Sequence, residues 1–337
     1  MLPCRAASDA PAGWELAYDY LVQDVCLDAA GLVVTGASPL DGPERCPRHR
    51  DLRVGERLPY HKHDWASRDD APRLPAGYQR SDSFPIRSTP LGVAVVQTFD
   101  FGDPPRGFDR FDVGDGGQIA IFSPRSVSFG LTEDAGDGLQ FFYGAACATG
   151  GPIERLHDSW VLVDASFARS RSGETLARIT KWRDRCPDRL GNAFTRWHER
   201  TLSLHVRSAG RETRRSVTLL ISDHFGGRNP ELANHLERFY FARELGLLRW
   251  ERWENLARPG DALVRAGVDL AAHAAALAAS GRCDDIAEAP APTGMWLMID
   301  CRQWTNVVAP RDPVGDPPGF WVDRLRGYEA SADLFAE

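Results

Sequence analysis

The stretch that decides the fold is RFYFARELGLLRWERWE, residues 238–254. Aromatic residues and leucines alternate with charged residues on both sides of Leu245-Gly246, which is the pattern of two half-buried strands. A glycine at the midpoint suits the positive φ that a tight turn requires. The segment can also be drawn as a helix, but the alternation favours a hairpin. It therefore predicts two antiparallel strands.

Short apolar or β-branched runs predict further strands along the chain. They lie at 91–99, 118–122, 139–143, 159–163, 201–206 and 216–222. Residues 14–20, WELAYDY, also alternate bulky and polar side chains and predict a strand near the N-terminus. Clusters of Gly, Asp and Pro, such as DVGDGG at 112–117, separate the runs. This spacing predicts a mainly β fold, either a jelly roll or a related antiparallel β-sandwich.

The remaining segments indicate how the chain is organised. Alanines and leucines dominate Asp261 to Ser280, which predicts one short C-terminal helix. Residues 41–90 are rich in Pro, Arg and Asp and lack a periodic pattern, so we expect long loops there. We interpret residues 1–256 as a β-sandwich core and residues 257–337 as an extension packed on it.

Bulk composition excludes several classes of protein. The net charge of −7 argues against general binding to the phosphate backbone of nucleic acids. No apolar run approaches the roughly 20 residues that a membrane-spanning helix needs. We therefore expect a soluble globular protein.

Seven cysteines, at 4, 26, 46, 147, 186, 283 and 301, are dispersed without the spacing of a zinc site. Such placement suits structural disulfides, which persist in oxidising compartments. Pairing neighbours in sequence joins Cys26 to Cys46, Cys147 to Cys186 and Cys283 to Cys301. We expect a secreted or periplasmic protein whose targeting peptide is absent or already removed.

The first candidate site is GERLPYHKHDW, residues 55–65. His61 and His63 stand two residues apart, so an extended chain places both rings on one face, where they can share a divalent metal. Asp64 can orient one ring, and Trp65 offers a stacking surface. The glycine followed by H-x-H resembles the start of the first cupin motif, which implies a divalent metal inside a jelly roll. A cupin has a Glu soon after the second His, whereas here Asp69 and Asp70 follow later. A catalytic pair without metal and a structural pair are the alternatives.

Two further groups can serve catalysis or binding. Asp223 and His224 lie where an apolar strand runs into a glycine-rich loop that also holds Arg228, a combination suited to acid/base work. The alternative is that they only cap this turn. The second group lies in the predicted hairpin. Alternation places Arg249, Glu251 and Trp253 on one face and Trp250, Arg252 and Glu254 on the other, so each face carries an aromatic ring, an acid and a base. Such faces suit sugars, although cross-strand ion pairs around core tryptophans explain them equally well. Trp304 adds another aromatic ring beside Thr305-Asn306.

These features predict an exported glycan-active enzyme that binds a polysaccharide or oligosaccharide. Its activity is expected to be that of a glycoside hydrolase or polysaccharide lyase, using acid/base side chains in a groove of the sandwich. The first alternative is a non-catalytic carbohydrate-binding or surface-interaction protein, which needs the tryptophans alone. The second is a cupin-like metal-dependent enzyme centred on His61 and His63.

Overall fold

The computed structural model describes residues 12–22, 24–34, 39, 43–51, 83–89, 92–98, 117–132, 160–183, 186–208, 211–260, 264–265, 267, 269–279 and 295–303. These residues form antiparallel sheets with few helices, so the prediction of a mainly β fold is confirmed. In both larger sheets, strands that follow one another in sequence are neighbours in space.

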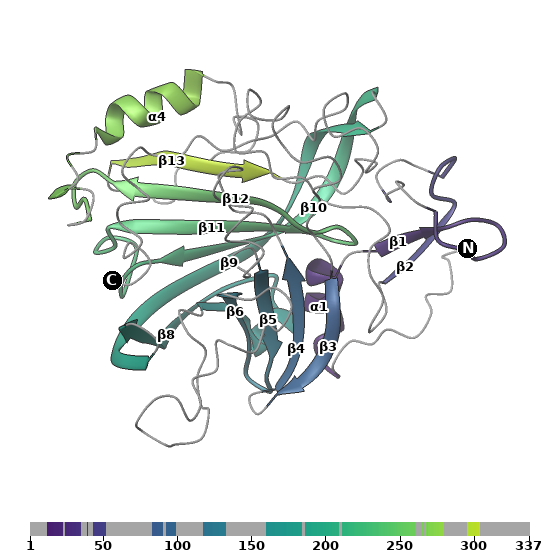
Figure 1. Cartoon of the computed structure of the whole chain (residues 1–337), viewed down its shortest axis with the longest axis horizontal. Coiled ribbons are helices and arrows are strands. Elements are labelled where there is room, and N and C mark those ends of the chain that lie inside the picture. Colours follow the sequence, from purple (N-terminus) through teal and green to yellow (C-terminus); the bar gives the residue numbers. More distant parts are fainter. Residues whose placement is uncertain are drawn as a thin grey trace.

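The larger sheet has six strands in the order β13-β12-β11-β10-β9-β8 (Figure 1). Their bounds are β8 (Ser172–Arg183), β9 (Cys186–Ser208), β10 (Arg211–Phe225), β11 (His235–Ala242), β12 (Gly246–Asn255) and β13 (Trp296–Gln303). The hairpin predicted at 238–254 is confirmed as β11 and β12, and Gly246 has the expected positive φ of 71°. The runs at 201–206 and 216–222 are parts of the longer strands β9 and β10.

The second sheet has five strands in the order β3-β4-β5-β6-β7. Their bounds are β3 (Ser83–Thr89), β4 (Gly92–Thr98), β5 (Gly117–Phe122), β6 (Ser126–Thr132) and β7 (Trp160–Asp164). These strands confirm the predictions at 91–99, 118–122 and 159–163, whereas 139–143 lies outside the described residues. In Figure 1 they run at a steep angle to the strands of the larger sheet.

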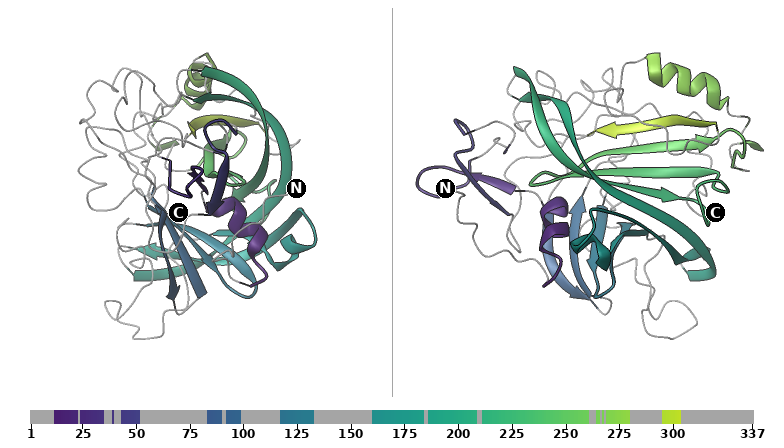
Figure 2. Two further views of the ribbon diagram at one scale, coloured as in Figure 1. Left: turned by 90° about the vertical axis from the view of Figure 1, so that its right-hand side faces the viewer. Right: turned by 180° about the vertical axis from the view of Figure 1, so that it is seen from behind.

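The main hydrophobic core lies between the two sheets. The smaller sheet contributes Phe122, Val127, Leu162 and Val163, and the larger one contributes Trp197, Leu220, Phe239, Phe241 and Trp250. Helix α1 (Glu15–Leu21) closes one side of this core through Tyr18, whose ring lies 6.0 Å from that of Phe122. Figure 2 shows α1 beside the smaller sheet.

The strand predicted at 14–20 is wrong, because these residues form α1. Trp14, Ala17, Tyr18 and Leu21 are buried and follow the i, i+3, i+4, i+7 spacing of a helix face. Tyr20 is also buried: its ring packs against Phe167, and its hydroxyl donates a hydrogen bond to Glu199 of β9. The apparent alternation includes Tyr20, which lies beside this helix face and contacts β9.

A small ribbon of two strands, β1 (Asp24–Leu27) and β2 (Arg48–Asp51), follows α1 (Figure 1). A disulfide joins Cys26 to Cys46, which confirms the first predicted pair. It indicates a non-cytoplasmic, oxidising environment. The other five cysteines occupy positions whose side chains the structure does not describe.

The segment 41–90, predicted as long loops, contains strands β2 and β3. The prediction of loops is therefore wrong at these two strands. Residues 52–82 lie outside the described part of the chain. Two further helices are α4 (Leu270–Ala279), within the predicted range, and the short η3 (Ala165–Ala168). No helix among the described residues is long and apolar enough to span a membrane.

The predicted extension contributes β13, which pairs with β12 of the larger sheet. A strand from residues 257–337 thus continues the sheet of residues 1–256. The boundary at 256 stays a prediction.

Candidate functional site

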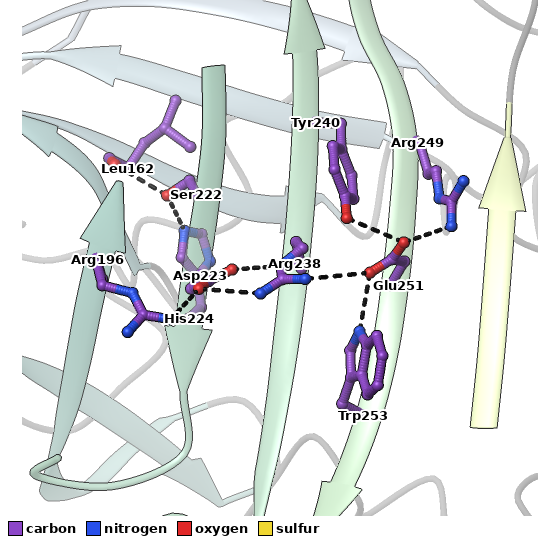
Figure 3. Close-up of polar contacts among 10 residues, drawn as sticks. All are labelled: Leu162, Arg196, Ser222, Asp223, His224, Arg238, Tyr240, Arg249, Glu251 and Trp253. Carbon is purple, nitrogen blue, oxygen red and sulfur yellow. Dashed lines mark hydrogen bonds and ion pairs between the residues drawn. The ribbon is translucent and has the colours of Figure 1, made fainter. Parts of the chain in front are cut away.

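A row of four charged side chains crosses the middle of the larger sheet (Figure 3). Arg196 on β9, Asp223 on β10, Arg238 on β11 and Glu251 on β12 occupy directly paired positions, so they project from the same face. Their charges alternate in sign from strand to strand. We call these four residues the charge row.

Asp223 is the centre of the charge row and is completely buried. Its two carboxylate oxygens accept hydrogen bonds from Arg238 Nε at 2.5 Å and from Arg196 Nη2 at 2.8 Å. Burial alone would raise the pKa of Asp223, but the two guanidinium groups outweigh it and hold this pKa below its usual value. Asp223 is therefore a carboxylate at neutral pH and a poor proton acceptor.

Glu251 ends the charge row and is equally buried. Arg249 Nη2 lies 2.6 Å from Glu251 Oε1, and Arg238 Nη1 lies 3.8 Å from Oε2. The Tyr240 hydroxyl and the Trp253 ring N–H donate hydrogen bonds of 3.0 and 2.8 Å to the same carboxylate. These donors occupy both oxygens and leave little room for a substrate.

The opposite face of β11 and β12 carries a second buried network. Arg252 bridges Glu237, at 2.9 Å, and Glu254, at 2.8 Å. The ring N–H of Trp250 donates to Glu237 at 3.2 Å. Burial raises the pKa of Glu254, against the opposing effect of Arg252. Cross-strand ion pairs thus surround the tryptophans on both faces of the hairpin. This arrangement matches the alternative interpretation of these residues, in which they stabilise the hairpin and do not bind a sugar.

His224 projects to the opposite face from Asp223 and faces the smaller sheet. Its Nε2 lies 2.9 Å from the Ser222 hydroxyl oxygen, and that hydroxyl donates to the carbonyl of Leu162 on β7 at 3.0 Å (Figure 3). Because the hydroxyl has a single proton, His224 Nε2 must be the donor to Ser222. Burial lowers the pKa of His224 to about 3, so the ring is neutral and weakly basic. The Ser-His contact joins the two sheets and does not present a nucleophile to solvent.

A second cluster lies where the β1–β2 ribbon meets the turn between β11 and β12. His49 Nδ1 is 2.6 Å from Asp24 Oδ2, and His49 Nε2 is 3.9 Å from Glu244 Oε2. One potential ligand atom from each of these residues lies within 4.8 Å of the other two. We call Asp24, His49 and Glu244 the junction cluster.

The junction cluster combines a buried group with accessible ones. The Asp24 side chain is 2% exposed, whereas those of His49 and Glu244 are 32% and 39% exposed. Burial is the main reason that the pKa of Asp24 is raised to about 7. The hydrogen bond with His49 lowers this pKa, and Asp51, paired opposite Asp24 on β2, contributes to raising it. An imidazole and two carboxyl groups this close to one another can hold a cation.

Comparison with known proteins leaves the function open. No family model matches the chain, and neither the curated proteins nor the solved structures include a significant match.

The structure separates the residues that the sequence grouped. Asp223 and His224 lie on opposite faces of β10, and Arg228 is exposed in the turn after it. Arg249, Trp250 and Glu251 are buried within the sheet, so none of them offers an open sugar-binding surface. The remaining predicted residues, His61, His63, Asp64, Trp65 and Trp304, lie outside the described residues.

Sequence reasoning missed the junction cluster, although one signal pointed toward it. Asp24 stands two residues before Cys26, and His49 stands three residues after Cys46. The correctly predicted disulfide therefore places these two side chains near each other. Glu244 could not be added, because its approach depends on how the hairpin packs against the ribbon.

Proposed function

We propose that this chain is an exported glycan-binding protein, built on two sheets that pack as a sandwich related to the jelly roll. The disulfide supports export, and the core shared by both sheets supports the sandwich. Polysaccharides and oligosaccharides are the expected ligands, because tryptophan rings stack on the apolar face of a sugar.

Binding is favoured over catalysis on the larger sheet because its buried carboxylates are already paired. Asp223, Glu237, Glu251 and Glu254 each contact at least one arginine and are at most 2% exposed. A general acid or base must reach the substrate and have a pKa near the working pH. Rigid ion pairs of this kind suit a scaffold that presents a ligand site elsewhere.

We assign the stacking on sugar rings to Trp65 and Trp304. Five other tryptophans are at most 8% exposed and belong to the core: Trp14, Trp197, Trp250, Trp253 and Trp296. They cannot stack on a sugar without unfolding. Outside this set, Trp65 follows His63-Asp64 and Trp304 precedes Thr305-Asn306, which are polar groups suited to sugar hydroxyls.

A glycan array probed with the labelled full chain tests the proposal, followed by calorimetric titration with a retained glycan. Trp65→Ala and Trp304→Ala should each weaken binding by at least tenfold, which is about 1.4 kcal/mol. Trp321→Ala is the matched control and should bind as the wild type does. No retained glycan, or wild-type affinity in both variants, would contradict the proposal.

The catalytic form of this proposal, a glycoside hydrolase or polysaccharide lyase, depends on His61, His63 and Asp64. The same glycans are incubated with the protein and their products analysed for new reducing ends and for unsaturated uronates. If turnover occurs, His61→Ala and His63→Ala should abolish it without changing the thermal midpoint. Loss of activity only in parallel with loss of stability would assign both histidines a structural role. A turnover that disappears with chelator would favour the cupin-like metal enzyme.

A further inference from the structure

We propose that the junction cluster is a binding site for a divalent transition-metal ion such as Zn²⁺. In this assignment His49 Nε2 and Glu244 bind the ion directly, Asp24 positions the His49 ring, and water completes the coordination. The proposed ligands do not include His61 or His63, and the assignment does not depend on the proposed glycan function.

The ring contacts of His49 match those of a metal-binding histidine. In such sites one ring nitrogen binds the metal, while the other donates its proton to a carboxylate that fixes the orientation of the ring. Asp24 Oδ2 is 2.6 Å from Nδ1 and is buried, so it is placed to accept this proton. The second nitrogen, Nε2, faces the carboxyl group of Glu244.

The distances allow one ion to contact both direct ligands. His49 Nε2 and Glu244 Oε2 are 3.9 Å apart. Bonds of about 2.0–2.2 Å to zinc can span such a separation after a small movement. The long, partly exposed side chain of Glu244 can make this movement. A nitrogen ligand with a carboxylate favours zinc or a similar transition metal over Mg²⁺ or Ca²⁺, which prefer oxygen ligands only.

The backbone holds the cluster together although its members are far apart in sequence. Asp24 N–H donates to the carbonyl of Glu244 at 2.7 Å, and Glu244 N–H donates to the carbonyl of Asp19 at 2.9 Å. The Cys26–Cys46 disulfide ties β1 to β2, with Cys26 directly opposite His49. The ligands are thus brought together before any ion arrives, which lowers the entropic cost of binding.

The charge around the cluster also favours a cation. Asp51 lies opposite Asp24 on the ribbon, so its carboxyl group adds negative charge next to the junction cluster, which already holds those of Asp24 and Glu244. Like charges at paired positions destabilise a ribbon, and a bound cation offsets that repulsion. The same ion would join the ribbon to the hairpin turn.

Titration calorimetry of the full chain with ZnCl₂, after removal of metals with a chelator, tests this assignment. We expect one Zn²⁺ per chain at the junction cluster and a much weaker response to MgCl₂. His49→Asn and Glu244→Gln should each reduce the Zn²⁺ affinity at least tenfold. Glu231→Gln, which removes an equally charged but distant exposed side chain, should leave the affinity unchanged. The thermal midpoint without metal shows whether each variant is folded.

The H-x-H pair can bind Zn²⁺ independently, so the double variant His61→Ala/His63→Ala is titrated as well. It should retain the ion that His49→Asn loses. Absence of Zn²⁺ binding, or loss of all binding in the double variant, would overturn the assignment. Unchanged affinity in Glu244→Gln would do so too, and this exposed residue leaves the core intact even if His49→Asn fails to fold.

Discussion

At the scale of single residues, the larger sheet shows how charges are accommodated in a protein interior. Removing one partner of a buried ion pair leaves an uncompensated charge, which costs about 3–5 kcal/mol. Asp223 avoids this cost through Arg196 and Arg238. His224, its neighbour in sequence, avoids it by staying neutral. Adjacent residues on opposite faces of one strand thus meet the same constraint in different ways.

His224 predicts a measurable pH dependence of stability. Its folded pKa of about 3 lies below the value of about 6.5 expected in the unfolded chain. Between these values only the unfolded chain binds the proton, so the unfolding free energy falls as pH falls. The slope is roughly 1 kcal/mol per pH unit. Urea denaturation between pH 6 and 4 should show a difference of this slope between the wild type and His224→Gln.

The variant and the wild type should have parallel stability curves above pH 7, where His224 is neutral in both states. Asp24, whose pKa is raised, contributes a slope of the opposite sign in both proteins. The difference between the curves therefore isolates His224. Curves that stay parallel down to pH 4 would show that His224 is protonated in the folded protein.

At the scale of elements, the charge row specifies how the strands align. A shift of β10 by one residue would turn Asp223 to the face of His224 and away from both arginines. Such a slip would bury unpaired charges, so the native alignment of β9, β10, β11 and β12 is strongly preferred. The buried ion pairs on both faces of the β11–β12 hairpin also favour the native alignment of these two strands.

The turn of this hairpin provides a test at the same scale. Gly246 has a φ of 71°, which a side chain disfavours by about 1–2 kcal/mol. Gly246→Ala should lower the unfolding free energy by about that amount in urea denaturation. Gly260→Ala is the control, because an added Cβ would meet its nearest atom, Asn234 Nδ2, at 3.4 Å without a positive φ. Equal stability of both variants would show that the turn adapts without strain.

At the scale of the whole molecule, a disulfide restricts the conformations of the unfolded chain. The Cys26–Cys46 bond links the ribbon across a sequence separation of 20 residues, for which the loss of loop entropy in the unfolded chain stabilises the fold by about 3 kcal/mol. The remaining cysteines are expected to form at least one more bond, Cys147–Cys186 or Cys283–Cys301.

Peptide mapping of the non-reduced protein by mass spectrometry should find Cys26–Cys46 together with one of these further bonds. Reduction should lower the denaturation midpoint, because the unfolded chain gains entropy. Cys4→Ser should change neither result, since Cys4 has no partner in the predicted pairing. A protein whose seven cysteines are all free would contradict the disulfide and the export inferred from it.

Local patterns were sufficient to predict much of the architecture. The hairpin at 238–254, most of the strand positions, the helix within 261–280 and the first disulfide follow from alternation, composition and spacing, because neighbouring residues determine these features. The same kind of pattern also showed which hairpin residues share a face, as the bonds among Arg249, Glu251 and Trp253 confirm.

Other features depend on which segments meet in space, and only the tertiary structure decided them. Residues 14–20 fit both a strand and a helix, and packing of Tyr18 against the core selects the helix. The partners of Asp223 come from two other strands, so its burial could not be read from its neighbours in sequence. Asp24, His49 and Glu244 meet because the hairpin turn docks on the ribbon, and contacts across such sequence distances leave no local pattern.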